Sequence, residues 1–217
     1  MKPTGIFEKD FRLAQEIFPK LRYELLEKYK LWLISGELDI CSQGDYWGTF
    51  KINITVSQNY PYCIPLVKEV STIIPRIEER HISKEGICCL DIDHNLIFMS
   101  KKGINLINFI KDIVYPYFAN QLFYDQNGEY ARGEFKHHFE GIKQFYAEEL
   151  DIKTKELAIA ILQRLLNKGT PSRNEICLCG AGKFKKCHWD SINFLKSLGK
   201  KRLEEDLKGF IKEKELY

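Results

Sequence analysis

The sequence predicts an α+β fold, in which an antiparallel β-meander is flanked by helices and followed by a small C-terminal module. Three observations point to this class. Apolar residues recur every three or four positions at the N terminus and again beyond residue 104, as in helices. Between residues 32 and 56 they alternate with polar residues, as in half-buried strands. From residue 75 to 99 no period holds, which indicates a long loop.

The first helix is expected within residues 7–29, where apolar residues line one face: Phe7, Phe11, Ala14, Ile17, Phe18, Leu21 and Leu25. Pro19 lies inside this segment, and we expect it to kink or break the helix because proline lacks a backbone N–H. Residues 32–40, 50–56 and 66–73 then predict three strands joined by short connections, which favours an antiparallel meander.

The C-terminal half is expected to be helical, at residues 104–122, 142–146, 157–166 and 191–214. Gly199 is a weak point of the last helix, because glycine is a poor helix former. The clearest linker is the Gly/Pro-containing segment 169–172. These features divide the chain into three parts: a domain of residues 1–150, a helix and linker of residues 151–172, and a module of residues 173–217.

Composition and charge indicate which class of protein this is, which partners it requires and which compartment it occupies. Apolar residues make up 44% of the chain and charged residues 29%, which is a globular balance. The net charge of +3 combines +4 from residues 173–217 with −1 from residues 1–172, an excess too mild to require nucleic acid or an acidic partner. Seven scattered cysteines do not make a disulfide framework, and no signal core or apolar run of about 18 residues occurs. We therefore expect a cytoplasmic protein in a reducing compartment, with no membrane contact.

Four residues of metal-ligand type lie within twelve positions near the C terminus, namely Cys177, Cys179, Cys187 and His188. Zinc prefers four tetrahedral sulfur or nitrogen ligands, which thiolates and imidazole supply. The alternative is three unpaired cysteines in a surface loop. We expect a structural zinc ion on these four residues.

The segment 173–188 resembles the SEC-C motif, the zinc knuckle at the C terminus of the SecA translocation motor. It departs from that motif in one respect: seven residues separate Cys179 from Cys187, where the motif usually has eight. The resemblance supports the zinc site but leaves the module's role open between binding protein, binding nucleic acid and stabilising the C terminus.

Two adjacent cysteines lie in the irregular stretch, in the segment Gly86-Ile-Cys-Cys-Leu-Asp-Ile92. Neighbouring side chains of an extended segment point to opposite faces, so one of Cys88 and Cys89 should be buried and the other exposed. Because free cysteines are often core residues, a packing role for the pair is the alternative to chemistry.

Together with Tyr60-Pro61 and His81, this segment resembles the ubiquitin-conjugating (E2) family, and in particular its bacterial branch, over roughly residues 5–150. The resemblance implies an E2-like fold: a helix, a four-stranded meander, an active-site loop and helices. A fourth strand would then lie near residues 82–90 or be very short. The resemblance also implies that Cys89 is a nucleophile that carries the C terminus of another protein as a thioester and passes it to an amine or other acceptor.

In the same family an Asn donates to the oxyanion, and alignment on the following Ile places His81 there. We assign His81 the oxyanion or acid–base role, with a structural loop histidine as the alternative. His137 is expected to be structural rather than part of a site.

The chain resembles standalone E2-like proteins of bacterial anti-phage operons of the CBASS type. This implies that the cargo is a ubiquitin-like protein or the C terminus of a cGAS-like nucleotidyltransferase, activated by an E1-like enzyme in many such systems. Two alternatives stay open: a catalytically inactive E2-like module that binds a ubiquitin-like protein, and a zinc-dependent nucleic-acid-associated protein. The slightly acidic balance of residues 1–172 disfavours nucleic acid as a partner.

Overall fold

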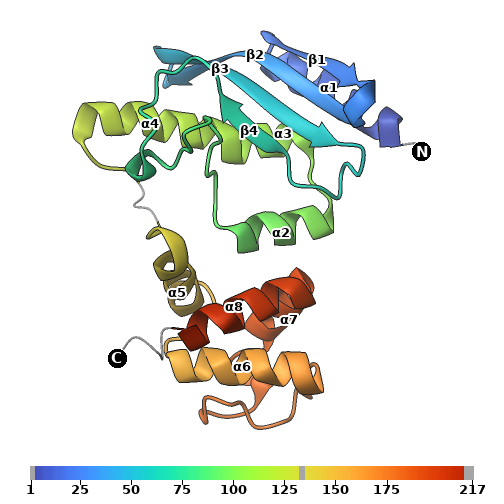
Figure 1. Cartoon of the computed structure of the whole chain (residues 1–217), viewed down its shortest axis with the longest axis vertical. Helices are drawn as coiled ribbons and strands as arrows, with labels where there is room; N and C mark the ends of the chain where they lie inside the picture. Colours follow the sequence, from blue (N-terminus) through green and yellow to red (C-terminus); the bar gives the residue numbers. More distant parts are fainter. Residues whose placement is uncertain (1–2, 132–134, 213–217) are drawn as a thin grey trace. The chain divides into compact units, whose positions relative to one another are not determined.

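The computed structural model describes residues 3–131 and 135–212, and the chain forms two compact units, Met1–Glu134 and Phe135–Tyr217 (Figure 1). The division falls before the boundary expected at residue 150, so the helix near residue 142 belongs to the second unit. None of the helices described is long and apolar enough to cross a membrane.

The first unit contains a four-stranded antiparallel sheet in the order β1-β2-β3-β4, which confirms the α+β class. Helix α1 (Pro3–Ile17) precedes it, and the strands are β1 (Leu21–Leu26), β2 (Leu31–Ser42), β3 (Asp45–Ser57) and β4 (Leu66–Glu69). A 3-10 turn, Glu27–Tyr29, joins β1 to β2. The prediction of a helix within residues 7–29 is wrong beyond Ile17, because residues 21–26 form the first strand. The fourth strand therefore precedes the three expected ones instead of following them.

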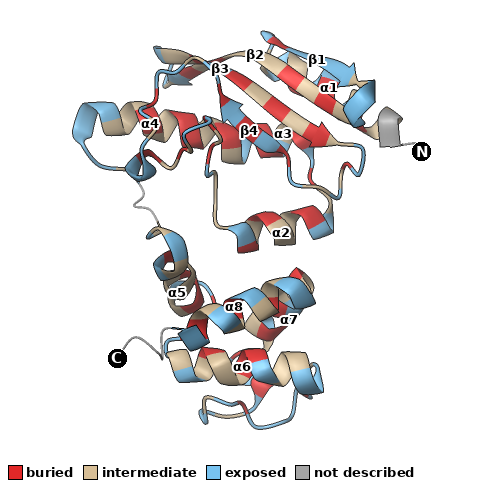
Figure 2. Ribbon diagram, in the orientation of Figure 1, coloured by how far each residue is buried: buried red, intermediate tan, exposed pale blue. Residues whose placement is uncertain are grey.

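Alternation of side chains along β2 and β3 builds the core of this unit (Figure 2). The buried members are Trp32, Ile34, Leu38, Ile40, Phe50, Ile52, Ile54 and Val56. Helix α1 covers this face: the ring of Phe7 stacks on Trp32 with centroids 4.4 Å apart and meets Tyr60 edge-on. The expected strand pattern is thus confirmed for both strands.

An irregular segment with a 3-10 turn at Glu78–Arg80 follows β4, as expected. Helix α2 (Asp93–Lys102) comes next; it begins within the stretch that showed no period and was not predicted. Helix α3 (Leu106–Phe109), a π-helical turn (Ile110–Val114) and helix α4 (Tyr115–Asn127) then confirm the helical prediction near residues 104–122. Pro116 lies in the first turn of α4, directly after the π-helical turn.

The second unit is helical, with α5 (His138–Glu148), α6 (Lys155–Lys168), a 3-10 turn (Phe184–Lys186), α7 (Trp189–Leu198) and α8 (Lys200–Lys212). Gly199 has a φ of +90° and divides the last predicted helix into α7 and α8, as its weak helix propensity suggested. The hydroxyl of Tyr146 in α5 donates to the buried carboxylate of Asp206 in α8 at 2.8 Å, and Arg202 pairs with the same carboxylate. This network ties α5 to α8.

Candidate metal centre and cysteine loop

The metal-ligand segment is a tight loop held by its own backbone. The N–H of Cys177 donates to the carbonyl of Gly182 at 2.7 Å, and the N–H of Gly180 donates to the carbonyl of Cys177 at 2.9 Å. Gly180 and Gly182 have φ values of +78° and +148°, which glycine adopts most easily. This turn brings the first two cysteines back toward Cys187 at the end of the following 3-10 turn.

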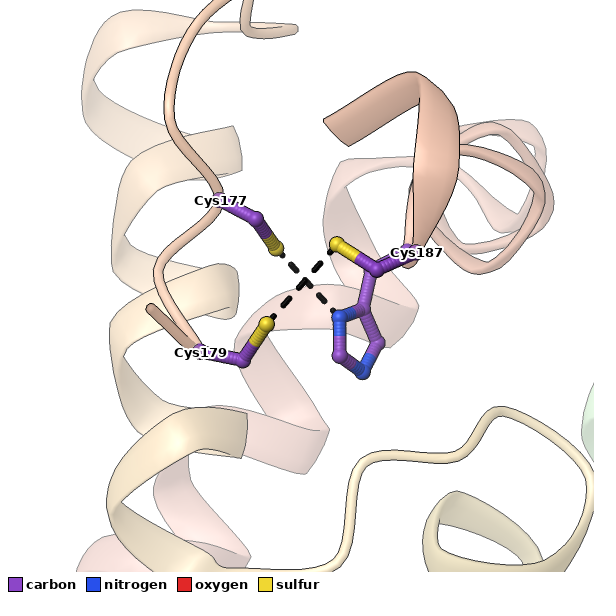
Figure 3. Close-up of side chains that lie close together, drawn as sticks. Cys177, Cys179 and Cys187 are labelled. Carbon is purple, nitrogen blue, oxygen red and sulfur yellow. Dashed lines mark hydrogen bonds between the residues drawn. The ribbon is translucent and has the colours of Figure 1, made fainter. Parts of the chain in front are cut away.

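The four predicted ligands converge on one point, and Figure 3 shows the three cysteine side chains directed toward one another. Their ligand atoms all lie within 4.8 Å of one another. The Sγ atoms of Cys179 and Cys187 are 3.7 Å apart, and Cys177 Sγ is 3.3 Å from His188 Nδ1. Four ligands at about 2.0–2.3 Å from a tetrahedral zinc ion would be roughly 3.3–3.8 Å apart. The cluster could therefore hold a metal ion.

A contact behind the cluster orients His188. Its Nε2 lies 2.9 Å from the carbonyl of Asp151, which can only accept, so Nε2 carries the proton. The lone pair of Nδ1 is then directed at the cluster, the tautomer that a metal ligand requires. The hydroxyl of Ser191 donates to the neighbouring carbonyl of Leu150 at 2.8 Å and fixes the same turn.

The thiols of the cluster differ in acidity. Burial raises the pKa of Cys177 to about 12. Burial also opposes ionisation of Cys179, but the backbone N–H of Ala181 and the neighbouring thiols outweigh it and lower that pKa to about 7. A bound divalent cation would keep both sulfurs ionised, so metal binding here must release protons.

The Cys88-Cys89 segment extends the sheet beyond β4. The N–H of Glu69 donates to the carbonyl of Gly86 and the N–H of Cys88 to the carbonyl of Val67, both at 2.9 Å. Side chains therefore alternate here as in a strand. Cys88 is buried, with 7% of its surface exposed, whereas Cys89 is exposed. The expectation that one cysteine is buried and that Cys89 is the outer one is confirmed.

A buried ion pair anchors this segment. The carboxylate of Glu69 is fully buried and lies 2.5 Å from Arg76 Nη2, which also donates to the Glu69 carbonyl at 2.9 Å. Gly86 passes so close that a Cβ there would lie 2.6 Å from that carbonyl oxygen. Only glycine fits this position at its φ of +86°. The sequence motif includes Gly86, but no sequence pattern pointed to Glu69 or to its pairing with Arg76.

The structure brings His81 and Cys89 together through the backbone. His81 ends the 3-10 turn at a φ of +48°, and its carbonyl accepts the N–H of Cys89 at 2.8 Å. The imidazole ring lies against Tyr130, with centroids 5.7 Å apart. The position beside Cys89 agrees with the predicted site, and the catalytic role of the ring stays a prediction. His137 immediately precedes α5 in the second unit.

Helix α4 supports the residues before His81. Arg80, which is buried, donates from Nε to Gln121 Oε1 at 2.8 Å and pairs with Asp125 at 2.7 Å. Tyr117 Oη lies 3.1 Å from the carbonyl of His81, the same oxygen that accepts from Cys89. These polar residues carried no sequence signal, because their partners lie more than 35 positions away.

The surroundings of Cys89 favour its neutral thiol. Partial burial raises the pKa of Cys89, and the carboxylates of Asp93 and Glu78 raise it further. Since the thiolate is the nucleophile, only a small fraction of Cys89 is reactive at neutral pH.

No protein-family model, curated protein or solved structure matches this chain. A function must therefore be inferred from the residues themselves.

Proposed function

We propose that this protein is an E2-like conjugating enzyme that carries a protein C terminus as a thioester on Cys89. The observation that carries the proposal is the exposed Cys89 on a hydrogen-bonded extension of the sheet, opposite the buried Cys88. A helix, an antiparallel four-stranded meander, a cysteine loop and further helices follow in the order that the resemblance implies. The cargo is a ubiquitin-like protein or a cGAS-like nucleotidyltransferase, delivered from an E1-like enzyme.

The proposed chemistry has two balanced steps. The thiolate of Cys89 attacks the carbonyl carbon of the incoming thioester; a new C–S bond forms, the old one breaks, and the donor thiolate leaves and takes up a proton. An acceptor amine then attacks the Cys89 thioester, an amide forms after loss of a proton, and Cys89 leaves as a thiolate. Both steps pass through an oxyanion that needs hydrogen-bond donors.

The backbone N–H of Cys89 already donates to His81, so it is not available to the oxyanion. The imidazole of His81, the group to which the family resemblance assigns this role, would then serve as a side-chain donor. We expect His81→Ala to slow discharge of the thioester by roughly tenfold to a thousandfold, the range for losing such a group. His81→Asn should retain much of the rate, because asparagine keeps a donor and tolerates a positive φ. If His81→Ala discharges normally, the histidine only ends the turn.

We infer that the second unit binds a structural zinc ion through Cys177, Cys179, Cys187 and His188. Three thiolates and one imidazole form the donor set of closed zinc sites. The ion would join the loop to the turn at residues 150–151 through His188.

The deciding experiment is to express the full chain with its genomic neighbours and search for a thiol-sensitive adduct by non-reducing electrophoresis and peptide mass spectrometry. The proposal requires the adduct on Cys89. The raised pKa of Cys89, with acidic rather than basic neighbours, favours a second candidate: a non-catalytic module that binds a ubiquitin-like protein. Stable binding of such a protein without any adduct would establish that candidate instead.

A further inference from the structure

Strand β1 is the open edge of the sheet in the first unit. Strands β1 and β4 lie at the two edges, and residues 86–88 cover the β4 edge through the hydrogen bonds to Val67 and Glu69. Strand β1 pairs with β2 on its inner side. Within residues 3–131, no segment pairs with its outer side, and Figure 1 shows β1 at the margin of the sheet. An open edge is a template for another strand.

The register shows which backbone groups face outward. The N–H of Val70 donates to the carbonyl of Lys51. The backbone N–H and carbonyl groups of odd-numbered residues in β3 therefore point toward β4, and those of even-numbered residues point toward β2. Following this alternation through β2, the even-numbered residues of β1 bond to β2 and the odd-numbered ones point away from the sheet. Gln15 and Phe18 already satisfy the backbone of Leu21. Tyr23 and Leu25 are left with outward N–H and carbonyl groups.

The strand is preformed for pairing. The ring of Tyr23 packs against Phe7 and Phe11 of α1, with centroids 5.3 and 4.8 Å apart, which fixes the backbone of the strand. A strand that is already ordered loses little conformational freedom when a second strand joins it.

The side chains of β1 are complementary to a second, antiparallel copy of themselves. If Tyr23 lies on a two-fold axis, Arg22 faces Glu24 of the second copy and Glu24 faces its Arg22. Both residues are exposed, and Glu24 forms no ion pair with any residue that the structure describes. The side chain of Arg22 donates through Nη1 to the carbonyls of Leu21 and Pro19, at 2.7 and 2.5 Å, which holds the guanidinium near the N-terminal end of β1.

We propose that two copies of this chain associate through antiparallel pairing of their β1 strands, centred on Tyr23, to form a continuous sheet across a two-fold axis. The two Tyr23 residues exchange N–H to carbonyl hydrogen bonds at the centre, and two Arg22–Glu24 pairs flank them. Charges on edge strands usually prevent such pairing, but here opposite signs meet. The proposal is independent of the chemistry at Cys89 and of the metal site.

Sedimentation equilibrium of the full chain over micromolar concentrations tests the proposal. The wild type should reach twice the 25.5 kDa mass of one chain. Arg22→Glu and Glu24→Arg each place two like-charged pairs across the axis, so each should weaken association by roughly tenfold to a hundredfold. The double variant Arg22→Glu/Glu24→Arg restores both pairs and should dimerise as the wild type does.

Lys51→Glu is the matched control, since it reverses an exposed charge on an interior strand and should leave the dimer intact. Circular dichroism verifies the fold of each variant. Amide hydrogen exchange at Tyr23 should slow as protein concentration rises. A monomeric wild type overturns the proposal, as does a dimer that survives both single reversals or fails to return in the double variant.

Discussion

At the scale of single residues, two neighbouring thiols have opposite surroundings. Cys88 is buried and Cys89 is exposed, although they are one position apart. We expect Cys88→Ser to lower the free energy of unfolding by about 1–3 kcal/mol, because a hydroxyl costs more to bury than the thiol it replaces. Cys89→Ser should leave stability unchanged and should abolish the thioester or trap cargo as an oxyester. Denaturant unfolding and adduct analysis of both variants check this. An adduct on Cys88 alone would place the nucleophile one residue earlier.

The pH dependence of Cys89 follows from its acidic neighbours. Burial and the carboxylates of Asp93 and Glu78 raise its pKa above the ordinary value of 9.0, so the thiolate forms only as the pH rises through that region. Asp93→Asn removes one negative charge, lowers the pKa and increases the thiolate fraction at fixed pH. Alkylation of Cys89 by iodoacetamide at about pH 8, below the ordinary pKa of a free thiol, should therefore be faster in Asp93→Asn than in the wild type. An equal or slower rate would show that Asp93 does not act on the thiol.

At the scale of elements, the cysteine segment depends on close backbone packing against β4. Gly86→Ala would place a Cβ against the Glu69 carbonyl at a φ of +86°. Gly44→Ala is a matched control, because Gly44 has a similar φ of +92° but nothing lies within 4 Å of the position that its Cβ would take. We expect the free energy of unfolding to fall by roughly 2–4 kcal/mol in Gly86→Ala and by about 1 kcal/mol in Gly44→Ala. If denaturant unfolding gives equal destabilisation for both variants, the contact between the added Cβ and the Glu69 carbonyl does not destabilise the fold.

At the scale of the whole molecule, the metal cluster belongs to the second unit alone. We expect about one zinc ion per chain by elemental analysis, as a single four-ligand site binds. Chelation should increase amide hydrogen exchange in residues 173–198 and leave β2 and β3 of the first unit protected, because the ligands Cys177 and His188 are part of the second unit's interior. Cys187→Ser should lower the zinc content, whereas Cys41→Ser, which changes an exposed cysteine of the first unit, should not. A metal-free chain with normal protection would rule out the zinc site.

The sequence by itself determined those features that depend on the spacing of residues close together in the chain. The alternation along β2 and β3, the convergence of four ligands within one loop and the opposite exposure of Cys88 and Cys89 all depend on spacing between near neighbours. The backbone geometry of strands and tight turns sets such spacing, so it can be predicted from the sequence.

Only the tertiary structure decided the remaining features. Leu21 and Leu25 are four positions apart, a spacing that fits one face of a helix and one face of a strand alike, and pairing with β2 made this segment a strand. The Glu69–Arg76 pair beside Gly86, the Arg80–Gln121 contact and the Asp151 carbonyl behind His188 join residues that are far apart in the sequence or carry no periodic signal. Such contacts form because burial makes each polar group find a partner in the folded chain, and the identity of that partner depends on the fold.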